Sequence, residues 1–190
     1  MIAQIALVRH GETEWNRQRR IQGRTDRPLN AAGLRQATAA GELLAGIAPE
    51  PGWAAVLSSP LSRARATAAG IGRVLGSSDA GQLSDLVERD YGSAEGRTVI
   101  EAETRWPGLD VPDAEPLAVL ATRGLGVLTR LLDEHPNSVA VSHGALLRAG
   151  LSSITGSPVP RLENGSVWVL ERDAAGRCRV SEIHHPRVPD

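Results

Sequence analysis

The chain has 190 residues, of which 41% are apolar and 23% charged, which is long enough for one buried core and short for two independent domains. Its formal charge of −1 gives no broad basic surface of the kind that proteins binding nucleic acid or membranes usually carry. All 21 basic residues are arginine, which excludes a lysine Schiff base and a P-loop lysine. We expect one domain over residues 1–185 and a short tail over 186–190.

Cys178 is the only cysteine, so the chain forms no internal disulfide and no multi-cysteine metal site. It is expected to be a small surface or strand residue rather than a nucleophile. The apolar run at residues 2–8 meets Arg9 and His10 before it reaches the length of a signal peptide or a membrane span. We therefore expect a cytoplasmic protein that binds neither membranes nor nucleic acid.

The first 75 residues predict two strand-to-helix junctions. Residues 5–8 form an apolar run too short for a helix, which predicts a buried parallel strand ending at Arg9. Apolar residues at helical spacing then predict an amphipathic helix over residues 30–47. A second apolar run at 53–57 precedes a helix predicted over residues 59–75, because serine followed by proline is a common helix start.

The middle of the chain is less regular. Residues 76–116, called the irregular segment below, are rich in Gly, Pro and Asp and show helical spacing only around residues 98–106. Such a segment predicts a lid or a specificity element. After it, a helix is predicted over 117–132, a third buried strand over 138–141 and a helix over 146–154. Two late strands, paired across a turn, are predicted at residues 167–170 and 180–183.

Strands that alternate with helices predict an open α/β sheet, which binds ligands outside the carboxyl ends of its strands. The three junctions carry Arg9 with His10, Arg63, and His143. An arginine fork matches phosphate oxygens, and a neutral histidine nitrogen can attack phosphorus. The sequence therefore predicts a phosphoryl pocket, which still needs a proton donor for the leaving oxygen. A carboxylic acid is the obvious candidate.

Five blocks of sequence, in order and spanning about residues 4–150, resemble the histidine phosphatase superfamily with its phosphoglycerate mutase-like fold. The blocks are Leu7-Val8-Arg9-His10-Gly11-Glu12-Thr13 with Trp15-Asn16, Gln22-Gly23, Ser58-Ser59-Pro60-Leu61 with Arg63-Ala64 and Thr67-Ala68, Glu88 with Tyr91-Gly92 and Glu95-Gly96, and Val141-Ser142-His143-Gly144. This resemblance implies a three-layer α/β/α sandwich around a mostly parallel sheet.

The resemblance also implies roles for individual residues. His10 is the implied nucleophile that becomes phosphorylated, and Glu88 the implied acid that protonates the leaving group and then activates water. The implied ligands of the transferring phosphoryl group are Arg9, Arg63 and His143. Further substrate contacts are implied for Asn16, Gln22, Gly23 and Gly144.

Several alternatives stay open at this point. Glu12 and Glu95 compete with Glu88 for the acid role. An arginine-rich loop either grips a second anionic group or is merely solvated, and its members are Arg19, Arg20, Arg24 and Arg27. We interpret the remaining aromatic and histidine candidates as packing residues or tail, and these are Trp15, Trp106, His184 and His185.

The leading functional hypothesis is a metal-independent phosphomonoesterase that hydrolyses a small phosphorylated metabolite through a phosphohistidine. It would need no cofactor and would act as a monomer or homodimer. One alternative is a cofactor-dependent phosphoglycerate mutase. As the family is known, mutases carry a lysine and an arginine pair after the Tyr-Gly block, and residues 93–106 contain neither. The other alternative is a non-catalytic phosphate-binding regulatory module, which is expected to have lost at least one of the implied site residues.

Two departures from the family pattern affect the substrate side. Ala94 stands before Glu95-Gly96, where hydrolases of the family more often have an aromatic residue. Ala114-Glu115-Pro116 replaces the Gly-Glu-Ser that these hydrolases usually show. The first departure predicts an altered wall facing the substrate, and the second removes the basis for expecting a substrate contact from that loop.

Overall fold

The computed structural model describes residues 3–77 and 80–183. Within these ranges six strands form one sheet, and they are β1 (Ala3–Arg9), β2 (Ala55–Ser58), β3 (Ala80–Gln82), β4 (Ser138–Ser142), β5 (Val167–Arg172) and β6 (Cys178–Ile183). The spatial order is β3-β2-β4-β1-β5-β6. The first four strands in this order run parallel, and β5 and β6 add an antiparallel edge. The mostly parallel sheet that we expected is confirmed.

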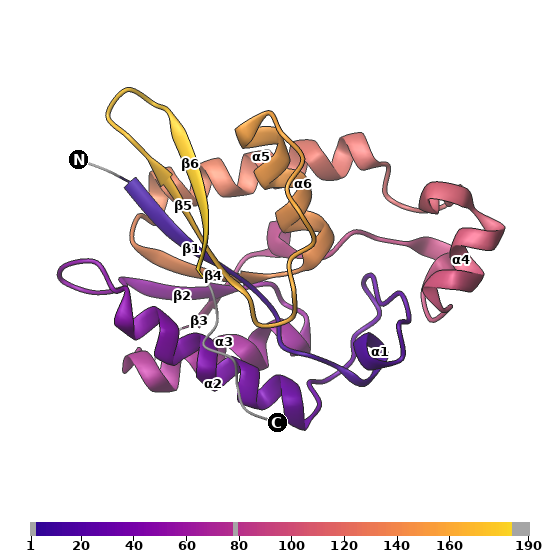
Figure 1. The fold of residues 1–190 in the computed structure, drawn as a ribbon, viewed down its shortest axis with the longest axis horizontal. Helices are drawn as coiled ribbons and strands as arrows, with labels where there is room; N and C mark the ends of the chain where they lie inside the picture. Colours follow the sequence, from indigo (N-terminus) through magenta and orange to yellow (C-terminus); the bar gives the residue numbers. More distant parts are fainter. Residues whose placement is uncertain (1–2, 78–79, 184–190) are drawn as a thin grey trace.

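Helices cover both faces of this sheet. The described helices are α1 (Glu14–Arg17), α2 (Ala31–Gly46), α3 (Ser62–Leu75), α4 (Val99–Arg105), α5 (Leu117–Glu134) and α6 (Gly144–Thr155). In Figure 1, α2 and α3 lie below the sheet and α5 and α6 above it, while α1 and α4 lie beyond its right-hand edge. The three-layer arrangement implied by the family resemblance is therefore confirmed.

The central strand β1 shows why the sheet holds two helical layers. Ile5 and Leu7 belong to the core on the α5 and α6 side, whereas Ala6 and Val8 belong to the core on the α2 and α3 side. All four side chains are fully buried, as expected where successive residues point to opposite covered faces. A continuous apolar run is thus the sequence signature of this strand.

The start of helix α3 and the presence of strand β3 differ from the sequence prediction. Helix α3 begins at Ser62 rather than at Ser59, because Leu61 is still extended and an Asp26 carboxylate oxygen accepts hydrogen bonds from the Ser62 amide at 2.9 Å and hydroxyl at 2.8 Å. The cap therefore comes from a loop 36 residues earlier. Strand β3 was not predicted, since its three residues include Gly81 and are too few to show a period.

The irregular segment contains short helical turns and a small core of its own. Besides α4 it holds the 3-10 turns η1 (Ser84–Leu86), η2 (Gly92–Ala94) and η3 (Pro107–Leu109). Its core joins Ala94, Ala102 and Val111 to Ile21, with Trp106 packed against them. This confirms the packing role of Trp106. Because Ala94 is fully buried there, its methyl group fills space that a larger aromatic side chain would overfill.

The last two strands pair as predicted, because β5 and β6 form an antiparallel hairpin. Cys178 begins β6 as a partly buried free cysteine, in agreement with the expectation of a strand residue. His184, His185 and the predicted tail lie outside the described residues. None of the described helices is both long and apolar enough to span a membrane.

Candidate active site

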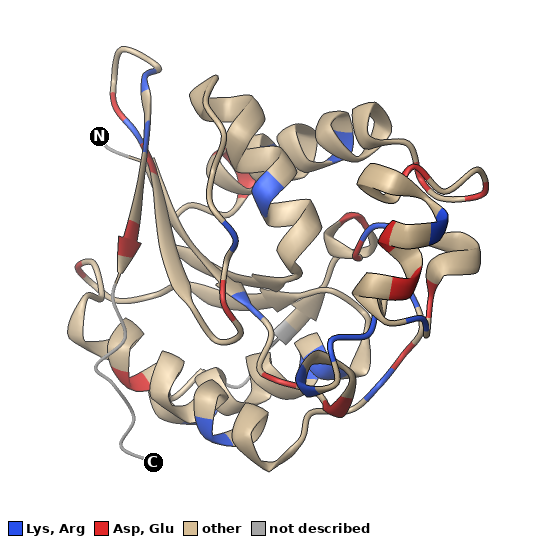
Figure 2. Ribbon diagram, turned by 45° about the vertical axis from the view of Figure 1, so that its right-hand side comes forward, with Lys and Arg blue, Asp and Glu red and all other residues tan. Residues whose placement is uncertain are grey.

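The carboxyl ends of β1 and β4 bring the predicted histidines together. These strands are neighbours in parallel register, with Arg9 opposite Ser142. His10 and His143 follow directly, and their ring centroids lie 5.1 Å apart. Arg63 joins them from the first turn of α3. Three segments far apart in the sequence thus meet at one edge of the sheet. Figure 2 shows many charged residues, coloured blue and red on the ribbon, in the loops on its right.

The hydrogen bonds of His10 settle which of its ring nitrogens is free to react. Nδ1 lies 2.7 Å from the carbonyl oxygen of Gly11, which can only accept, so Nδ1 carries the hydrogen. Nε2 is then unprotonated and accepts from Nε of Arg63 at 3.3 Å. Burial lowers the pKa of His10 well below its ordinary value, and the charges of Arg63 and Arg9 lower it further. The arrangement presents a neutral imidazole with a lone pair on Nε2.

Arg63 is fully buried and is held by the loop that follows α1. Its Nη1 donates to the carbonyl of Thr25 at 3.0 Å, and its Nη2 donates to the carbonyl of Gly23 at 2.7 Å. Burial lowers the pKa of Arg63, while the carboxylates of Glu88 and Asp26 oppose that effect. An arginine remains charged under such conditions. The site therefore contains a fixed buried cation in contact with His10.

Two further nitrogen atoms are left for a ligand. Nε of Arg9 and Nδ1 of His143 are buried and have no hydrogen-bond partner in the described part of the chain. Arg9 is anchored through Nη1, which donates to the carbonyl of Leu162 at 2.6 Å. His143 is anchored through Nε2, 2.8 Å from Oγ of Ser59. When that hydroxyl donates to Nε2, Nδ1 carries a hydrogen suited to an oxygen of a phosphoryl group.

Burial also lowers the pKa of His143 well below its ordinary value, and the charges of Arg63, His10 and Arg9 add to the effect. His143 is therefore neutral together with His10. The positive charge of the pocket comes from the two arginines, which stay protonated at any working pH.

Glu88 is placed against the start of α6, the helix that follows His143. One carboxylate oxygen accepts from the amide of Ala145 at 3.3 Å, and the other accepts from the amides of Leu146 at 3.2 Å and Arg89 at 2.9 Å. The first amides of a helix have no partner within the helix, so they bind a carboxylate well. Only 9% of the surface of Glu88 is exposed to solvent. Its carboxylate is thus fixed at the amino end of the helix that directly follows His143.

The two competing carboxylates have other partners. Glu95 accepts from the amides of Arg24 and Thr25, both at 2.8 Å, and from the Thr25 hydroxyl at 2.5 Å. Glu12 accepts from the side-chain amide of Asn30 at 2.7 Å. Glu95 therefore holds the loop that binds Arg63, and Glu12 holds the start of α2.

The implied substrate contacts lie around the same edge. Asn16 is bound through Oδ1, which accepts from the amide of Thr13 at 3.1 Å in a helix capping box. Gln22 is bound through Oε1, which accepts from the Thr13 hydroxyl at 2.9 Å. Both contacts use the acceptor oxygen and not the side-chain NH₂ group, which is a hydrogen-bond donor.

The two implied glycines each make room for a neighbouring side chain. Gly23 has a φ of +52°, and a Cβ there would collide with the carboxylate of Glu95. A Cβ on Gly144 would lie 3.3 Å from Nε of Arg9, the atom that has no partner. Glycine therefore leaves space at these two positions for the carboxylate of Glu95 and for the guanidinium of Arg9.

Some residues at the site were not identified from the sequence. Ser59, which was read only as a helix cap, contacts His143. Asn164 donates through Nδ2 to the carbonyl of His10 at 3.0 Å. Asn164 lies before β5, outside every motif used above, and an Asn-Gly pair indicates a turn without indicating what the turn contacts.

The arginine-rich loop has divided roles. Arg20 donates to the carbonyl of Gly96 at 2.7 Å, and the guanidinium of Arg27 lies 4.3 Å from the ring centre of Trp15. Arg24 borders Glu88, because its Nε lies 3.4 Å from the carbonyl oxygen of that residue. That a member of this loop binds a second anionic group stays a prediction.

Comparison with known proteins places this geometry in a family. The model of the histidine phosphatase superfamily (branch 1) matches residues 5–183. The uncharacterized phosphatase PhoE of Bacillus subtilis is 40% identical over 162 residues, which cover 84% of this chain and 81% of that protein. The metal-independent phosphoserine phosphatase of Arabidopsis thaliana is 36% identical over 89% of this chain and 76% of its own length. The probable phosphoglycerate mutase GpmB of Citrobacter koseri is 35% identical over 96% and 85%.

A solved structure agrees with these relatives. Phosphoserine phosphatase of Entamoeba histolytica, in complex with 3-phosphoglyceric acid, superposes with a TM-score of 0.80 at 25% sequence identity, covering 96% of this chain and 98% of that one. The family match spans nearly all the described residues, including both histidines and both arginines of the pocket. The chain belongs to the histidine phosphatase superfamily.

Proposed function

We propose that the protein is a metal-independent phosphomonoesterase that works through phosphorylation of His10. The observation that carries the proposal is the state of His10, whose unprotonated Nε2 is held by Arg63 while Nδ1 is fixed on a carbonyl. A nucleophile needs an unprotonated nitrogen in a fixed direction, and the lone pair on Nε2 can attack phosphorus once the substrate displaces the 3.3 Å contact with Arg63. Glu88, fixed on the amides of α6, supplies a carboxyl group for proton transfer.

In the first step, Nε2 of His10 bonds to phosphorus while the ester oxygen leaves with a proton from the carboxyl group of Glu88. Arg9, Arg63 and Nδ1 of His143 bind the phosphoryl oxygens, where their charge and hydrogen bonds stabilise the transition state. In the second step, water attacks phosphorus, its proton passes to the Glu88 carboxylate and the N–P bond breaks. The products are the alcohol and inorganic phosphate, and the enzyme returns to its starting state.

The preferred substrate in this proposal is a small phosphorylated metabolite with an anionic group near the ester. Two relatives by sequence or structure are named phosphoserine phosphatase, and one is bound to 3-phosphoglyceric acid. Arg24 supports the same class of substrate. Its half-exposed guanidinium lies beside the backbone of Glu88 and forms only long ion pairs, each of 3.6 Å, with Asp90 and Glu115. A substrate carboxylate can compete with Asp90 and Glu115 for this guanidinium, because such long, partly exposed ion pairs are weak.

We place hydrolysis ahead of mutase activity. A mutase must retain its leaving group and exclude water while the phosphohistidine persists. Residues 93–106 contain no lysine and no two adjacent arginines for this purpose, although one relative carries the mutase name. A phosphate-binding regulatory module is less well supported, because all the implied site residues are present and converge on one edge of the sheet.

The test of the proposal is phosphate release from a panel of phosphomonoesters with a metal chelator present. We expect phosphoserine and 3-phosphoglycerate to be turned over at undiminished rates, because two arginines supply the positive charge and the described residues include no group of three metal-ligating side chains. Vanadate should inhibit competitively, since it mimics the five-coordinate phosphoryl group. Activity that disappears on chelation and returns with a divalent ion would contradict the proposed mechanism.

The acid role of Glu88 has its own test. Glu88→Gln keeps the shape of the side chain but removes its proton, so kcat/KM for an alkyl phosphate should fall at least tenfold more than for an activated aryl phosphate, within the range of about 10² to 10⁴ typical of general acid catalysis. kcat/KM is the right measure because it reports formation of the phosphohistidine and not its hydrolysis. Equal losses on both substrates would mean that Glu88 only shapes the pocket.

A further inference from the structure

One side chain of α5 donates hydrogen bonds to backbone carbonyls next to Glu88. Arg123 donates through Nη1 to the carbonyls of Asp85 at 2.9 Å and Val87 at 2.7 Å. Its Nη2 lies 3.4 Å from the carbonyl of Glu88 itself. The carbonyl between these positions, on Leu86, accepts from Oγ of Ser142 at 2.7 Å. Successive carbonyls of an otherwise irregular stretch are therefore fixed from α5 and from the end of β4.

The guanidinium of Arg123 is itself clamped by Glu115. Nε donates to one carboxylate oxygen at 2.9 Å and Nη2 donates to the other at 2.7 Å. The pair is largely buried, with side-chain exposures of 17% and 9%. Burial raises the pKa of Glu115, but the hydrogen bonds and charge of Arg123 outweigh that effect and the pKa is lowered. A bidentate, partly desolvated pair of this kind fixes the orientation of the fork more firmly than a surface ion pair.

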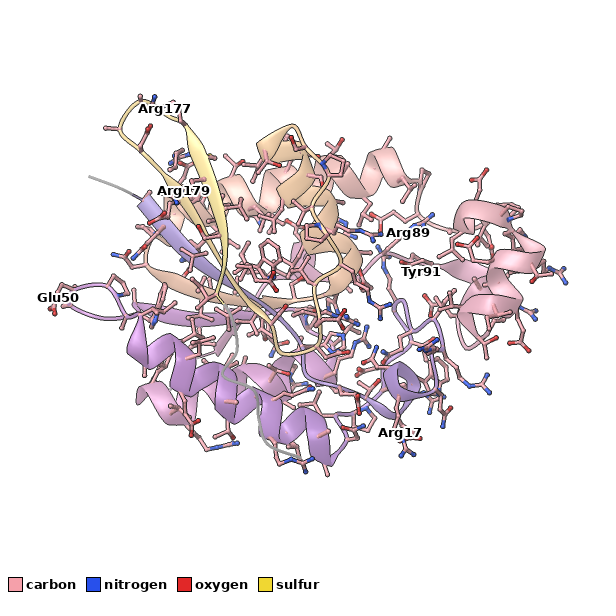
Figure 3. All side chains as sticks on the ribbon, viewed as in Figure 1. Arg17, Glu50, Arg89, Tyr91, Arg177 and Arg179 are labelled. Carbon is pink, nitrogen blue, oxygen red and sulfur yellow. The ribbon has the colours of Figure 1, made fainter. Side chains whose placement is uncertain are left out.

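The clamp is also part of a set of contacts that join Glu88 to the end of the irregular segment. Arg89, which follows Glu88, donates through Nε to the carbonyl of Glu115 at 2.9 Å and through Nη2 to the carbonyl of Leu109 at 3.3 Å. Figure 3 shows Arg89 and Tyr91, both in the irregular segment, in the strip of chain between α6 and the turns around α4. The end of the irregular segment and the backbone of the acid are thus joined by two arginines.

We propose that Arg123, clamped by Glu115, is a positioning residue for the general acid Glu88. The proposal rests on the proposed function, since it assumes that Glu88 protonates the leaving group. Its physical basis is that the two ends of Glu88 are held separately. Amides of α6 bind the carboxylate, whereas Arg123 binds the backbone. Loss of the backbone contact changes the distance from the carboxyl group to the ester oxygen, and displacements of about 1 Å can cost about 10²-fold in rate.

The expected signature is a loss that depends on the leaving group. In Arg123→Gln, kcat/KM should fall about tenfold more for an alkyl phosphate than for an activated aryl phosphate, because only the alkyl ester needs the proton of Glu88. A merely structural defect would lower both values together. In the Glu88→Gln background the same change should add no further selective loss, because residues that act through each other are not additive.

The matched control is Arg130→Gln. Arg130 lies on the same helix and contacts the same stretch through an exposed ion pair with Asp85 at 2.8 Å, but it does not grip the carbonyls near the acid. The values of kcat/KM for the alkyl and the aryl phosphate should both stay near those of the wild type in this variant. Glu95→Gln gives a second comparison, because it disturbs the loop that binds Arg63 and should therefore lower kcat/KM for both substrates alike.

The outcomes separate this inference from the proposed function. If Glu88→Gln itself shows no dependence on the leaving group, the proposed acid is wrong. If Glu88→Gln shows the dependence and Arg123→Gln lowers both substrates equally, the positioning role is overturned while the mechanism stands. Should Arg123→Gln fail to fold, Glu115→Gln decides the matter alone, because it weakens the ion pair that orients the guanidinium of Arg123 toward the carbonyls. A greater loss of kcat/KM for the alkyl phosphate in this variant supports the inference, and equal losses for the two substrates refute it.

Discussion

His10→Ala is expected to abolish turnover, with kcat/KM reduced by about 10³-fold or more for both alkyl and aryl phosphates, as expected when a covalent nucleophile is removed. Nε2 of His10 is the unprotonated nitrogen that Arg63 holds within 3.3 Å. His143 cannot replace it in that geometry, because its Nε2 faces Ser59 and its Nδ1 carries the hydrogen when the Ser59 hydroxyl donates to Nε2. The loss should be independent of the leaving group, which distinguishes the nucleophile from the acid.

The control for this variant is His135→Ala, since His135 lies at the end of α5, away from the pocket residues, and its removal should leave the rate unchanged. Quenching the wild-type reaction with labelled substrate should trap an acid-labile phosphate on His10. Substantial phosphatase activity in His10→Ala, or label on another residue, would move the nucleophile elsewhere.

Arg63→Gln is expected to lower kcat/KM by about 10² to 10³-fold for both classes of substrate, the usual effect of losing one group that stabilises charge in the transition state. The variant loses the buried cation, the hydrogen bond to His10 and the two bonds to the loop carbonyls at once. Arg65→Gln is the matched control, because Arg65 lies on the same helix and is exposed. A retained rate in Arg63→Gln would remove Arg63 from the phosphoryl site.

The same variant should change the pH dependence of kcat/KM. The charge of Arg63 is one of the causes that lower the pKa of His10, after burial itself. Without that charge the pKa of His10 rises toward its ordinary value, so the histidine becomes protonated, and inactive as a nucleophile, at higher pH than in the wild type. The acid limb of the profile should therefore move to higher pH. An unchanged limb would show that Arg63 does not act on the charge state of His10.

The convergence of Arg9, His10, Arg63 and His143 could be predicted because it follows from local signals. Each short apolar run ends at a junction, and parallel strands place their carboxyl ends at one edge. The core of the sheet was predictable for the same reason, since a continuous apolar run such as residues 5–8 marks a strand covered on both faces. Roles within the site came from the family motifs rather than from these patterns.

The contacts that hold the site could not be predicted in the same way. Asp26 caps α3, Glu95 binds the amides of residues 24 and 25, and Arg123 binds carbonyls 35 to 38 positions earlier in the chain. Such pairs have no period and no fixed spacing in the sequence. In a helix pattern, Arg123 is indistinguishable from a solvated arginine, and Glu95 reads equally well as a catalytic acid.

The loop that binds Arg63 has a consequence for how the enzyme loses activity. Its carbonyls hold the guanidinium, while its amides are held by Glu95, a residue of the irregular segment and not of the sheet. A local opening that moves Glu95 away from this loop would leave the strands paired and would loosen the two carbonyls that bind Arg63. Mild denaturant can then inactivate the enzyme at concentrations at which its circular dichroism is still that of the native state.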